Sequence, residues 1–389
     1  MSTAAGARAD QRTALEALLR RHVEEGTVPG AVALLGGEDA EPVAVGRLAV
    51  DGPAMPVDAV VRIQSMTKVV TAVAALRAVE AGHLGLDDAV ERWLPELADR
   101  RVLRHPAAEV DDTVPAPGPI TLRHLLTCTS GYGMVVDGSP LGTALAANGT
   151  EAGPLPWAGG ADAWLARLAA LPLAFAPGTG WRYHHSFSVL GVLLARVAGR
   201  PLADHLAADL LGPLGLRDTG FWVPADRLDR LPAAYRAEDG ALVETEPAGG
   251  GPYAGPPDVD VSHGELVSTA ADYHRFLRAL ATRAPVDGTP LLSAEHLALL
   301  TSDQVAPALK TPESFFPGFW DGTGWGFGVA VVTAGPAAGR YGWSGGQGTD
   351  FFVHPDGTTG ILLTQVELGE RTWGLLQEFQ ALRDPDRLS

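Results

Sequence analysis

The stretch IQSMTKVVTAVAALRAVEAGHLGLDD, residues 63–88, marks the point where strand-like sequence gives way to helical sequence. Between residues 65 and 81 most side chains are apolar and only three are charged, and the run stops at Gly82, a residue type that commonly follows a helix end. The pattern predicts a mostly buried helix. Its first turn carries Ser65 and Lys68, and a spacing of three places their side chains on one face.

A serine and a lysine in this arrangement can act as nucleophile and base. A serine hydroxyl is a poor nucleophile until a neighbouring base takes its proton, and a lysine can do so only when desolvation or another cation lowers its pKa. The valines at positions 69, 70 and 73 supply an apolar environment for Lys68, and the helix N-terminus offers N–H groups to an oxyanion. An isolated S-x-x-K pair is more often a helix cap beside a solvated lysine. The position of this pair, after strands and at the start of an apolar helix, favours the catalytic interpretation.

Strand-like runs at both ends of the chain bracket a helical middle. Short Val-, Leu- and Ala-rich runs separated by turn residues occupy the segment before Ser65 and the segment after residue 323. Between them lie helical segments separated by Pro- and Gly-rich loops. This order predicts an α+β fold in which both chain ends form one antiparallel sheet, flanked by helices, beside an all-helical region. We expect a sheet domain of residues 1–82 and 290–389 together, and a mostly helical region, residues 83–289, that completes the active-site cleft.

Composition limits the classes of partner. The 389 residues carry 29 Lys and Arg against 46 Asp and Glu, a net charge of −17, which gives no basis for binding nucleic acid. Cys128 is the only cysteine, so no intrachain disulfide can form. Residues 1–25 lack the apolar core of a signal peptide, and no run of about 18 uncharged apolar residues follows. We expect a soluble, cytoplasmic protein with no membrane partner, and the oligomeric state stays open.

Six motifs resemble, in order, those of one family of serine enzymes. The residue 63–88 stretch is similar to the first motif of the family that includes class C β-lactamases, D-alanyl-D-alanine peptidases, family VIII carboxylesterases and related acyltransferases. The later matches are ITLRHLLTCTSGY (120–132), PGTGWRYHHSFSVLGVLLARVAGRPL (177–202), ELVSTAADYHRFLRAL (265–280), GWGFGVAV (324–331) and YGWSGGQGTDFFVHPDG (341–357). The resemblance covers the chain from about residue 25 to 370. It implies a β-lactamase/transpeptidase-like fold and an acyl-enzyme formed on Ser65.

The resemblance assigns a proton-handling role to Tyr183. This residue matches the tyrosine of the family's Y-x-N motif, which shares proton transfer with the lysine, and we expect the buried ammonium of Lys68 to lower the phenol pKa. His185 stands where the family often has asparagine, so we expect it to contact the substrate; the alternative is a loop histidine with no chemical role. His263 replaces a residue that is typically glycine shortly before the LVST segment, and we expect it to border the cleft.

A third motif supplies the strand beside the substrate. Trp343, Ser344 and Gly345 match the strand-borne K-T-G or H-x-G of β-lactamases, and the resemblance implies that the backbone N–H groups of Gly346 and Ser65 form the oxyanion hole. A cation at position 343 would bind a substrate carboxylate, which tryptophan cannot do. Tryptophan at this place resembles the family VIII esterases and their acyltransferase relatives.

Other classes of function fit the sequence less well. Residues 342–346 satisfy the G-x-S-x-G nucleophile elbow of α/β-hydrolases, but too few residues follow Ser344 for the remaining βα units. No H-E-x-x-H or Cys/His cluster predicts a metal, and no cofactor is expected. A scaffold that only binds has no need to keep Ser65, Lys68 and Tyr183 together.

The sequence therefore predicts a serine hydrolase of small-molecule esters, thioesters or amides, and a carboxylesterase first. The alternative is an acyltransferase, transesterase or amide-bond enzyme of secondary metabolism on the same fold. A β-lactamase or a D-amino-acid peptidase ranks below both.

Overall fold

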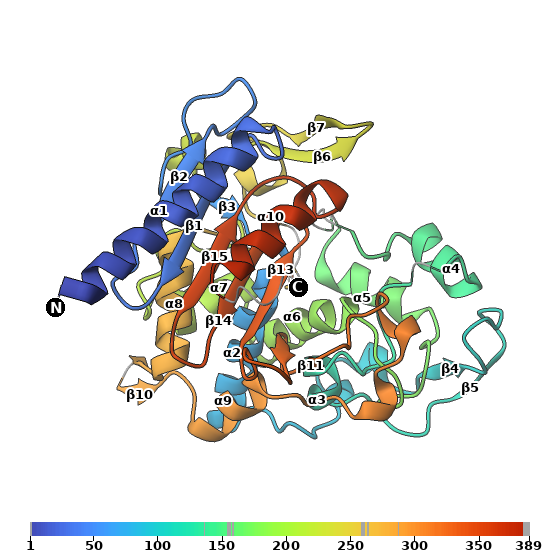
Figure 1. The fold of residues 1–389 in the computed structure, drawn as a ribbon. Coiled ribbons are helices and arrows are strands. Elements are labelled where there is room, and N and C mark those ends of the chain that lie inside the picture. Colours follow the sequence, from blue (N-terminus) through green and yellow to red (C-terminus); the bar gives the residue numbers. More distant parts are fainter. Residues whose placement is uncertain are drawn as a thin grey trace.

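A seven-stranded antiparallel sheet forms the centre of the molecule (Figure 1). The computed structural model describes residues 2–135, 137–153, 157, 159–257, 261–262, 264–286 and 288–383. The strands lie in the order β11-β12-β13-β14-β15-β1-β2. Their bounds are β1 (Gly30–Gly36), β2 (Val43–Gly46), β11 (Thr323–Trp325), β12 (Ala330–Val332), β13 (Tyr341–Gly345), β14 (Thr349–Val353) and β15 (Thr359–Leu363).

The sheet joins the two ends of the chain. β1 and β15 pair antiparallel, with Val32 opposite Leu363 and Leu34 opposite Ile361. The strands before the nucleophile segment and those after residue 323 therefore belong to one sheet, which confirms the predicted α+β architecture.

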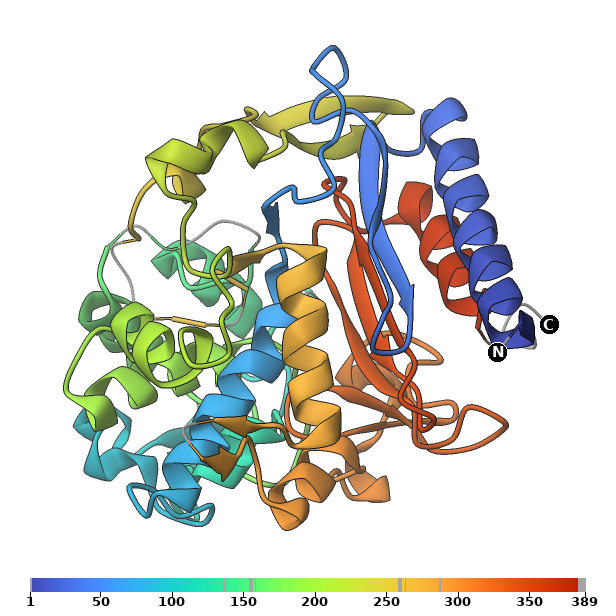
Figure 2. The same ribbon diagram turned by 90° about the vertical axis from the view of Figure 1, so that its left-hand side faces the viewer.

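Different helices cover the two faces of the sheet (Figure 2). α1 (Ser2–Glu24) and α10 (Glu370–Ala381) lie on one face, whereas α2 (Thr67–Glu80) and α8 (Ala270–Thr282) lie on the other. The alternation of side chains along a strand explains this arrangement. In β1, Ala31 and Ala33 pack with the α1 and α10 side chains, while Val32 and Leu34 belong to the larger core that contains α2 and α8. Both faces of β1 are therefore apolar.

The middle of the chain is mainly helical but also contains short strands. Its helices are α3 (Leu122–Leu126), α4 (Pro140–Asn148), α5 (Ala161–Ala169), α6 (His185–Ala198) and α7 (Leu202–Leu206), which continues as a π-helical turn (Ala207–Leu211); α9 (Ala294–Thr301) follows α8. The short pairs are β4 (Arg101–Leu103) with β5 (Thr113–Pro115), β6 (Ala234–Glu238) with β7 (Ala241–Glu246), and β9 (Pro285–Val286) with β10 (Thr289–Pro290). The strands of β4–β5 and β9–β10 are two or three residues long and leave little periodicity in a sequence. β6 and β7 are five and six residues long and flank Asp239-Gly240, a hairpin signal that was missed in the sequence.

No single helix among the described residues is long and apolar enough to cross a membrane. One pair, His185–Ala198 with Leu202–Leu211, meets the length and composition criteria when joined, but it is bent by 75°.

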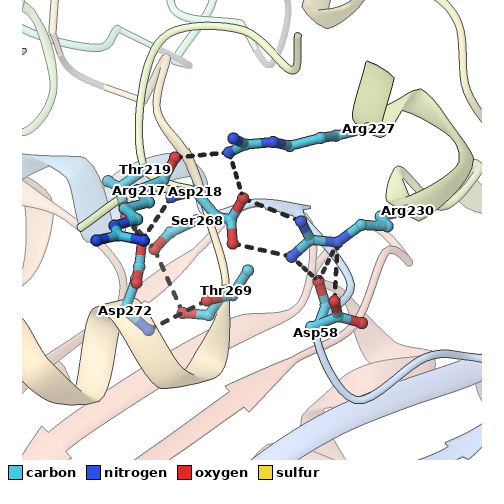
Figure 3. Close-up of polar contacts among 9 residues, drawn as sticks. All are labelled: Asp58, Arg217, Asp218, Thr219, Arg227, Arg230, Ser268, Thr269 and Asp272. Carbon is cyan, nitrogen blue, oxygen red and sulfur yellow. Dashed lines mark hydrogen bonds and ion pairs between the residues drawn. The ribbon is translucent and has the colours of Figure 1, made fainter. Parts of the chain in front are cut away.

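A polar cluster fixes the short strand pair that leads to the nucleophile (Figure 3). β3 (Val61–Arg62), which shortly precedes Ser65 in the chain, pairs with β8 (Val267–Ser268). Asp218 accepts two hydrogen bonds of 3.0 Å from Arg230, and its own N–H donates to Asp272 Oδ2 at 2.7 Å. Thr219 Oγ1 lies 2.8 Å from Ser268 Oγ in β8. The cluster thereby ties β8, and through it β3, to the surrounding loops.

Candidate active site

Ser65 lies in a tight turn between β3 and α2. The turn is a 3-10 helix, η1 (Gln64–Met66), so the regular helix begins two residues later than the apolar run predicts. Gln64 adopts a φ of 49°, a conformation that is unfavourable for a residue with a side chain. Hydrogen bonds from outside hold the turn: Tyr273 Oη donates to the Met66 carbonyl at 2.9 Å, and Thr349 Oγ1 donates to the Ile63 carbonyl at 3.1 Å. Backbone strain beside Ser65 is typical of a functional site.

Lys68 contacts the serine directly. Its Nζ lies 2.8 Å from Ser65 Oγ, and the lysine side chain is fully buried. Burial lowers the pKa of Lys68 to about 7, and the electrostatic interactions with Cys128 and Glu265 oppose this shift only in part. A substantial share of the lysine is therefore a neutral amine near neutral pH, which is the form that can accept a proton from Ser65.

Tyr183 completes the cluster from the other side of the serine. It lies two residues before α6, makes a hydrogen bond with Ser65, and accepts one from Trp343 Nε1 at 2.6 Å. Lys68 Nζ lies 4.6 Å from the centre of the Tyr183 ring. The structure thus brings Ser65, Lys68 and Tyr183 together.

The expected lowering of the Tyr183 pKa is wrong. Burial raises the pKa of this phenol, and the hydrogen bonds with Ser65 and Trp343 only partly counter that effect. That expectation rested only on the positive charge of Lys68. Because Lys68 is itself buried and its pKa is about 7, much of it is uncharged near neutral pH. Burying a phenolate away from water costs more free energy than the hydrogen bonds with Ser65 and Trp343 contribute.

The end of β13 approaches the nucleophile turn closely because Gly345 has no side chain. A Cβ at this position would stand 2.2 Å from Thr349 Oγ1 and 2.5 Å from the Ile63 carbonyl oxygen. Only glycine allows the strand to lie this near Ser65. Gly346 and Ser65 line the same cavity, so their placement is compatible with paired oxyanion donors, and that role remains a prediction.

A cavity of about 440 Å³ opens over Ser65. Its wall is largely apolar and aromatic, which suits a small-molecule acyl or ring system. The lining residues are Gln64, Ser65, Met134, Ala152, Gly153, Tyr183, His184, Phe315, Phe316, Trp343, Ser344, Gly346, Glu367, Leu368 and Trp373.

His185 is placed differently from expectation. His185 is buried, its Nε2 lies 2.6 Å from the Thr150 carbonyl oxygen, and it does not line the cavity. His184 lines the cavity instead. The reason is local: His184 has a φ of 93°, which turns the chain just before α6, so the side chain one position earlier meets the pocket. His263 lies outside the described residues.

Ser344 lacks the setting of a nucleophile elbow. It lies within strand β13, whereas the elbow requires a sharp turn between a strand and a helix. Its Oγ donates to Asp350 Oδ1 at 2.7 Å, and Gln380 Nε2 donates to the other oxygen of that carboxylate at 2.9 Å. Ser344 and Trp343 both line the cavity, and their contact with a substrate remains a prediction.

Several residues at the site were missed in the sequence. Phe315, Phe316 and Trp373 form part of the cavity wall, and the aromatic segment FFPGFW at 315–320 was an available signal. Cys128 has a φ of 59°, and its carbonyl accepts a hydrogen bond of 3.0 Å from the N–H of Arg182, next to Tyr183. Burial raises the pKa of the Cys128 thiol to about 12, so it stays protonated. Within the described ranges, no group of three His, Cys, Asp or Glu residues could hold a metal ion.

Comparison with known proteins identifies the family. The Beta-lactamase family model matches residues 15–371. The chain belongs to this family. Its fold is β-lactamase/transpeptidase-like, and together with the relatives described below this makes it an enzyme of the serine hydrolase and acyltransferase type.

Proteins similar to this chain include esterases. The uncharacterized protein MT1414 of Mycobacterium tuberculosis is 38% identical over 315 residues, which cover 78% of this chain and 76% of that protein. Esterase EstB of Burkholderia gladioli is 33% identical over 322 residues, which cover 78% of this chain and 76% of the esterase. The solved structure of EstCE1, described as a hydrolase with promiscuous acyltransferase activity, has a TM-score of 0.77 and 26% identity, and the match covers 97% of this chain and 98% of that one.

Proposed function

We propose that this Beta-lactamase family enzyme hydrolyses carboxylic esters of small molecules through an acyl-Ser65 intermediate. The observation that carries the proposal is the contact of Lys68 Nζ with Ser65 Oγ at 2.8 Å, where Ser65 lines a largely apolar cavity. The 33% identity to an esterase supports hydrolysis of esters over other acyl substrates.

In the proposed reaction Lys68 is the base and Tyr183 begins in its protonated form. Neutral Lys68 accepts the hydroxyl proton as Ser65 Oγ attacks the ester carbonyl, and the N–H groups of Ser65 and Gly346 stabilise the oxyanion. Tyr183 then donates its phenolic proton to the departing alcohol oxygen and regains one from the Lys68 ammonium. Water then attacks the acyl-Ser65 ester with the same proton transfers in reverse order. Ser65 regains its proton and the carboxylic acid is released. The raised phenol pKa suits this order, because it disfavours a free phenolate at the outset.

The pH dependence of turnover should follow the ionisation of Lys68. Below its pKa of about 7 the amine is protonated and cannot act as a base. We therefore expect kcat/KM for a neutral ester to rise by roughly tenfold per pH unit towards about pH 7 and then to level off. The measurement is kcat/KM between pH 5 and 9 at constant ionic strength. A fall in kcat/KM as the pH rises through 7 would mean that the reaction needs the ammonium form.

Trp343 favours neutral esters over carboxylate-bearing β-lactams. A cation at this place could bind a substrate carboxylate, but the indole is uncharged and its only N–H donates to Tyr183. Since the indole N–H is already used, Trp343 supplies an apolar surface to the substrate.

A panel of p-nitrophenyl esters and a cephalosporin tests the substrate class. We expect rapid hydrolysis of the short-chain esters, insensitive to added alcohols or amines, and little cephalosporin turnover. Cephalosporin turnover well above ester turnover would contradict the argument from Trp343.

Acyl transfer is the second candidate, because EstCE1 is a hydrolase with promiscuous acyltransferase activity. In that case the ester is hydrolysed slowly in water alone. An added alcohol or amine acceptor accelerates consumption of the ester and forms a new acyl product. Thioesters and amides remain alternative donors. A cytoplasmic location also stays a proposal; the single buried cysteine requires no oxidising compartment.

A further inference from the structure

The charged groups around the cavity are unequally distributed. Among the described residues that line it, Glu367 is the only one with a carboxylate, and none is a lysine or an arginine. Lys68 contacts Ser65 but does not line the cavity, and its pKa of about 7 leaves much of it uncharged near neutral pH. Arg182, the residue before Tyr183, donates to the Met134 carbonyl at 3.2 Å and lies 3.9 Å from Asp137. A bound substrate therefore meets a negative charge in the wall, while the neighbouring arginine is already paired.

Backbone hydrogen bonds place Glu367 close to the reacting centre. The N–H of Glu367 donates to the Tyr235 carbonyl at 2.8 Å, and the N–H of the next residue, Leu368, donates to the Gly346 carbonyl at 2.8 Å. Thr372 Oγ1 donates to the Glu367 carbonyl at 3.3 Å. Gly346 is the predicted oxyanion donor, so the segment that carries Glu367 is attached to the residue beside the scissile bond. The carboxylate is exposed but its backbone is fixed.

Aromatic rings surround the same opening. Phe316 is 45% exposed and Trp373 is 43% exposed, unusual values for large apolar side chains, and both line the cavity. Phe315 also lines the cavity, and the centroid of its ring lies 4.6 Å from that of Phe316 and 6.2 Å from that of Trp343. Aromatic faces attract organic cations, and a carboxylate among them adds a Coulombic attraction. The same surroundings repel a carboxylate on the substrate.

We propose that this cavity selects esters that carry a positively charged ammonium group, in preference to neutral esters, and excludes anionic ones. The proposal rests on the esterase function proposed above and names its substrate class. Glu367 and the rings of Phe316 and Trp373 hold the ammonium group while the ester carbonyl lies at Ser65. The net charge of −17 acts in the same direction, because it raises the local concentration of cations.

Two esters of equal shape test the charge alone. Butyrylcholine carries a positively charged quaternary nitrogen, and 3,3-dimethylbutyl butyrate has an uncharged quaternary carbon in the same place. A butyrate ester of similar length that carries a carboxylate is the anionic substrate. We expect kcat/KM to be about tenfold higher for the cationic ester than for its neutral isostere, and lowest for the anionic ester. The advantage should shrink as salt rises to about 0.5 M, because Glu367 is exposed and its charge is screened.

Glu367→Gln and Glu370→Gln form the matched pair of variants. Each removes one exposed carboxylate from the same segment, but only Glu367 lines the cavity. We expect the ratio of cationic to neutral kcat/KM to fall about threefold to fivefold in Glu367→Gln, with the aromatic faces retaining the remainder, and less than twofold in Glu370→Gln. Trp373→Leu should lower the ratio severalfold, since it removes an aromatic face. Equal effects of the two glutamate variants, or a wild-type ratio of one or less, would overturn the proposal.

The outcome separates this inference from the esterase proposal. Hydrolysis of the neutral isostere with a ratio of one or less refutes the charge preference and leaves the esterase function intact. If no ester is hydrolysed, the esterase proposal fails, and calorimetric titration of Ser65→Ala protein with butyrylcholine and its isostere still decides the preference. Tighter binding of the cation then supports it, and equal or weaker binding refutes it.

Discussion

Replacing Ser65 with alanine should abolish ester turnover and covalent labelling by a fluorophosphonate while the protein stays folded. The hydroxyl oxygen contacts Lys68 and Tyr183, and the proposed chemistry has no other nucleophile. Loss of the nucleophile in serine hydrolases costs roughly 10⁴- to 10⁶-fold in kcat. The measurements are initial rates with a p-nitrophenyl ester, labelling followed by mass spectrometry of the intact protein, and a thermal melt.

Two further serine variants make the Ser65→Ala result specific. Ser302→Ala changes an exposed hydroxyl outside the cavity and should react and label like the unmodified protein. Ser344→Ala tests the competing nucleophile, whose Oγ is bonded to Asp350. Near-normal activity in Ser65→Ala, together with loss of labelling in Ser344→Ala, would falsify the assignment of the nucleophile.

The parts of the structure that sequence predicted are those fixed by spacing and order along the chain. Ser65 and Lys68 are three residues apart at the start of an apolar run, so helical geometry alone brings them together. The strand-like runs at both ends predict one sheet built from both chain ends, and the structure shows that the two ends meet where β1 pairs with β15. Tyr183 came from a family motif, and no spacing argument would have found it.

The parts that sequence did not predict depend on single backbone torsions and on burial. The positive φ of His184 decides which of two adjacent histidines meets the cavity, and such a torsion is too uncommon outside glycine to be predicted at a single position. Burial reverses the expected shift of the Tyr183 pKa, and burial is a property of the packed site. Trp373 reaches the cavity from α10, more than 300 residues beyond Ser65, so only the fold places it there.

Lys68 and Tyr183 should behave as one unit when both are replaced. Each contacts Ser65, and Lys68 Nζ lies 4.6 Å from the centre of the Tyr183 ring. If protons pass from Ser65 through both groups, removal of either one breaks the relay. We expect Lys68→Ala and Tyr183→Phe each to lower kcat/KM by about 10²- to 10⁴-fold. The double variant should lose little more than the worse single variant.

The double variant distinguishes a shared relay from separate roles because the two cases differ by orders of magnitude. Independent contributions multiply, so two losses of about 10³ would give about 10⁶, whereas a shared relay leaves the loss near 10³. The rates of all four proteins should be compared above pH 7, where the unmodified enzyme holds Lys68 largely neutral. A leaving group as acidic as p-nitrophenol needs no proton, so Tyr183→Phe should be less harmful with that ester than with an alkyl ester. Equal losses with both esters would place Tyr183 in the activation of Ser65, because only that step precedes departure of the alcohol.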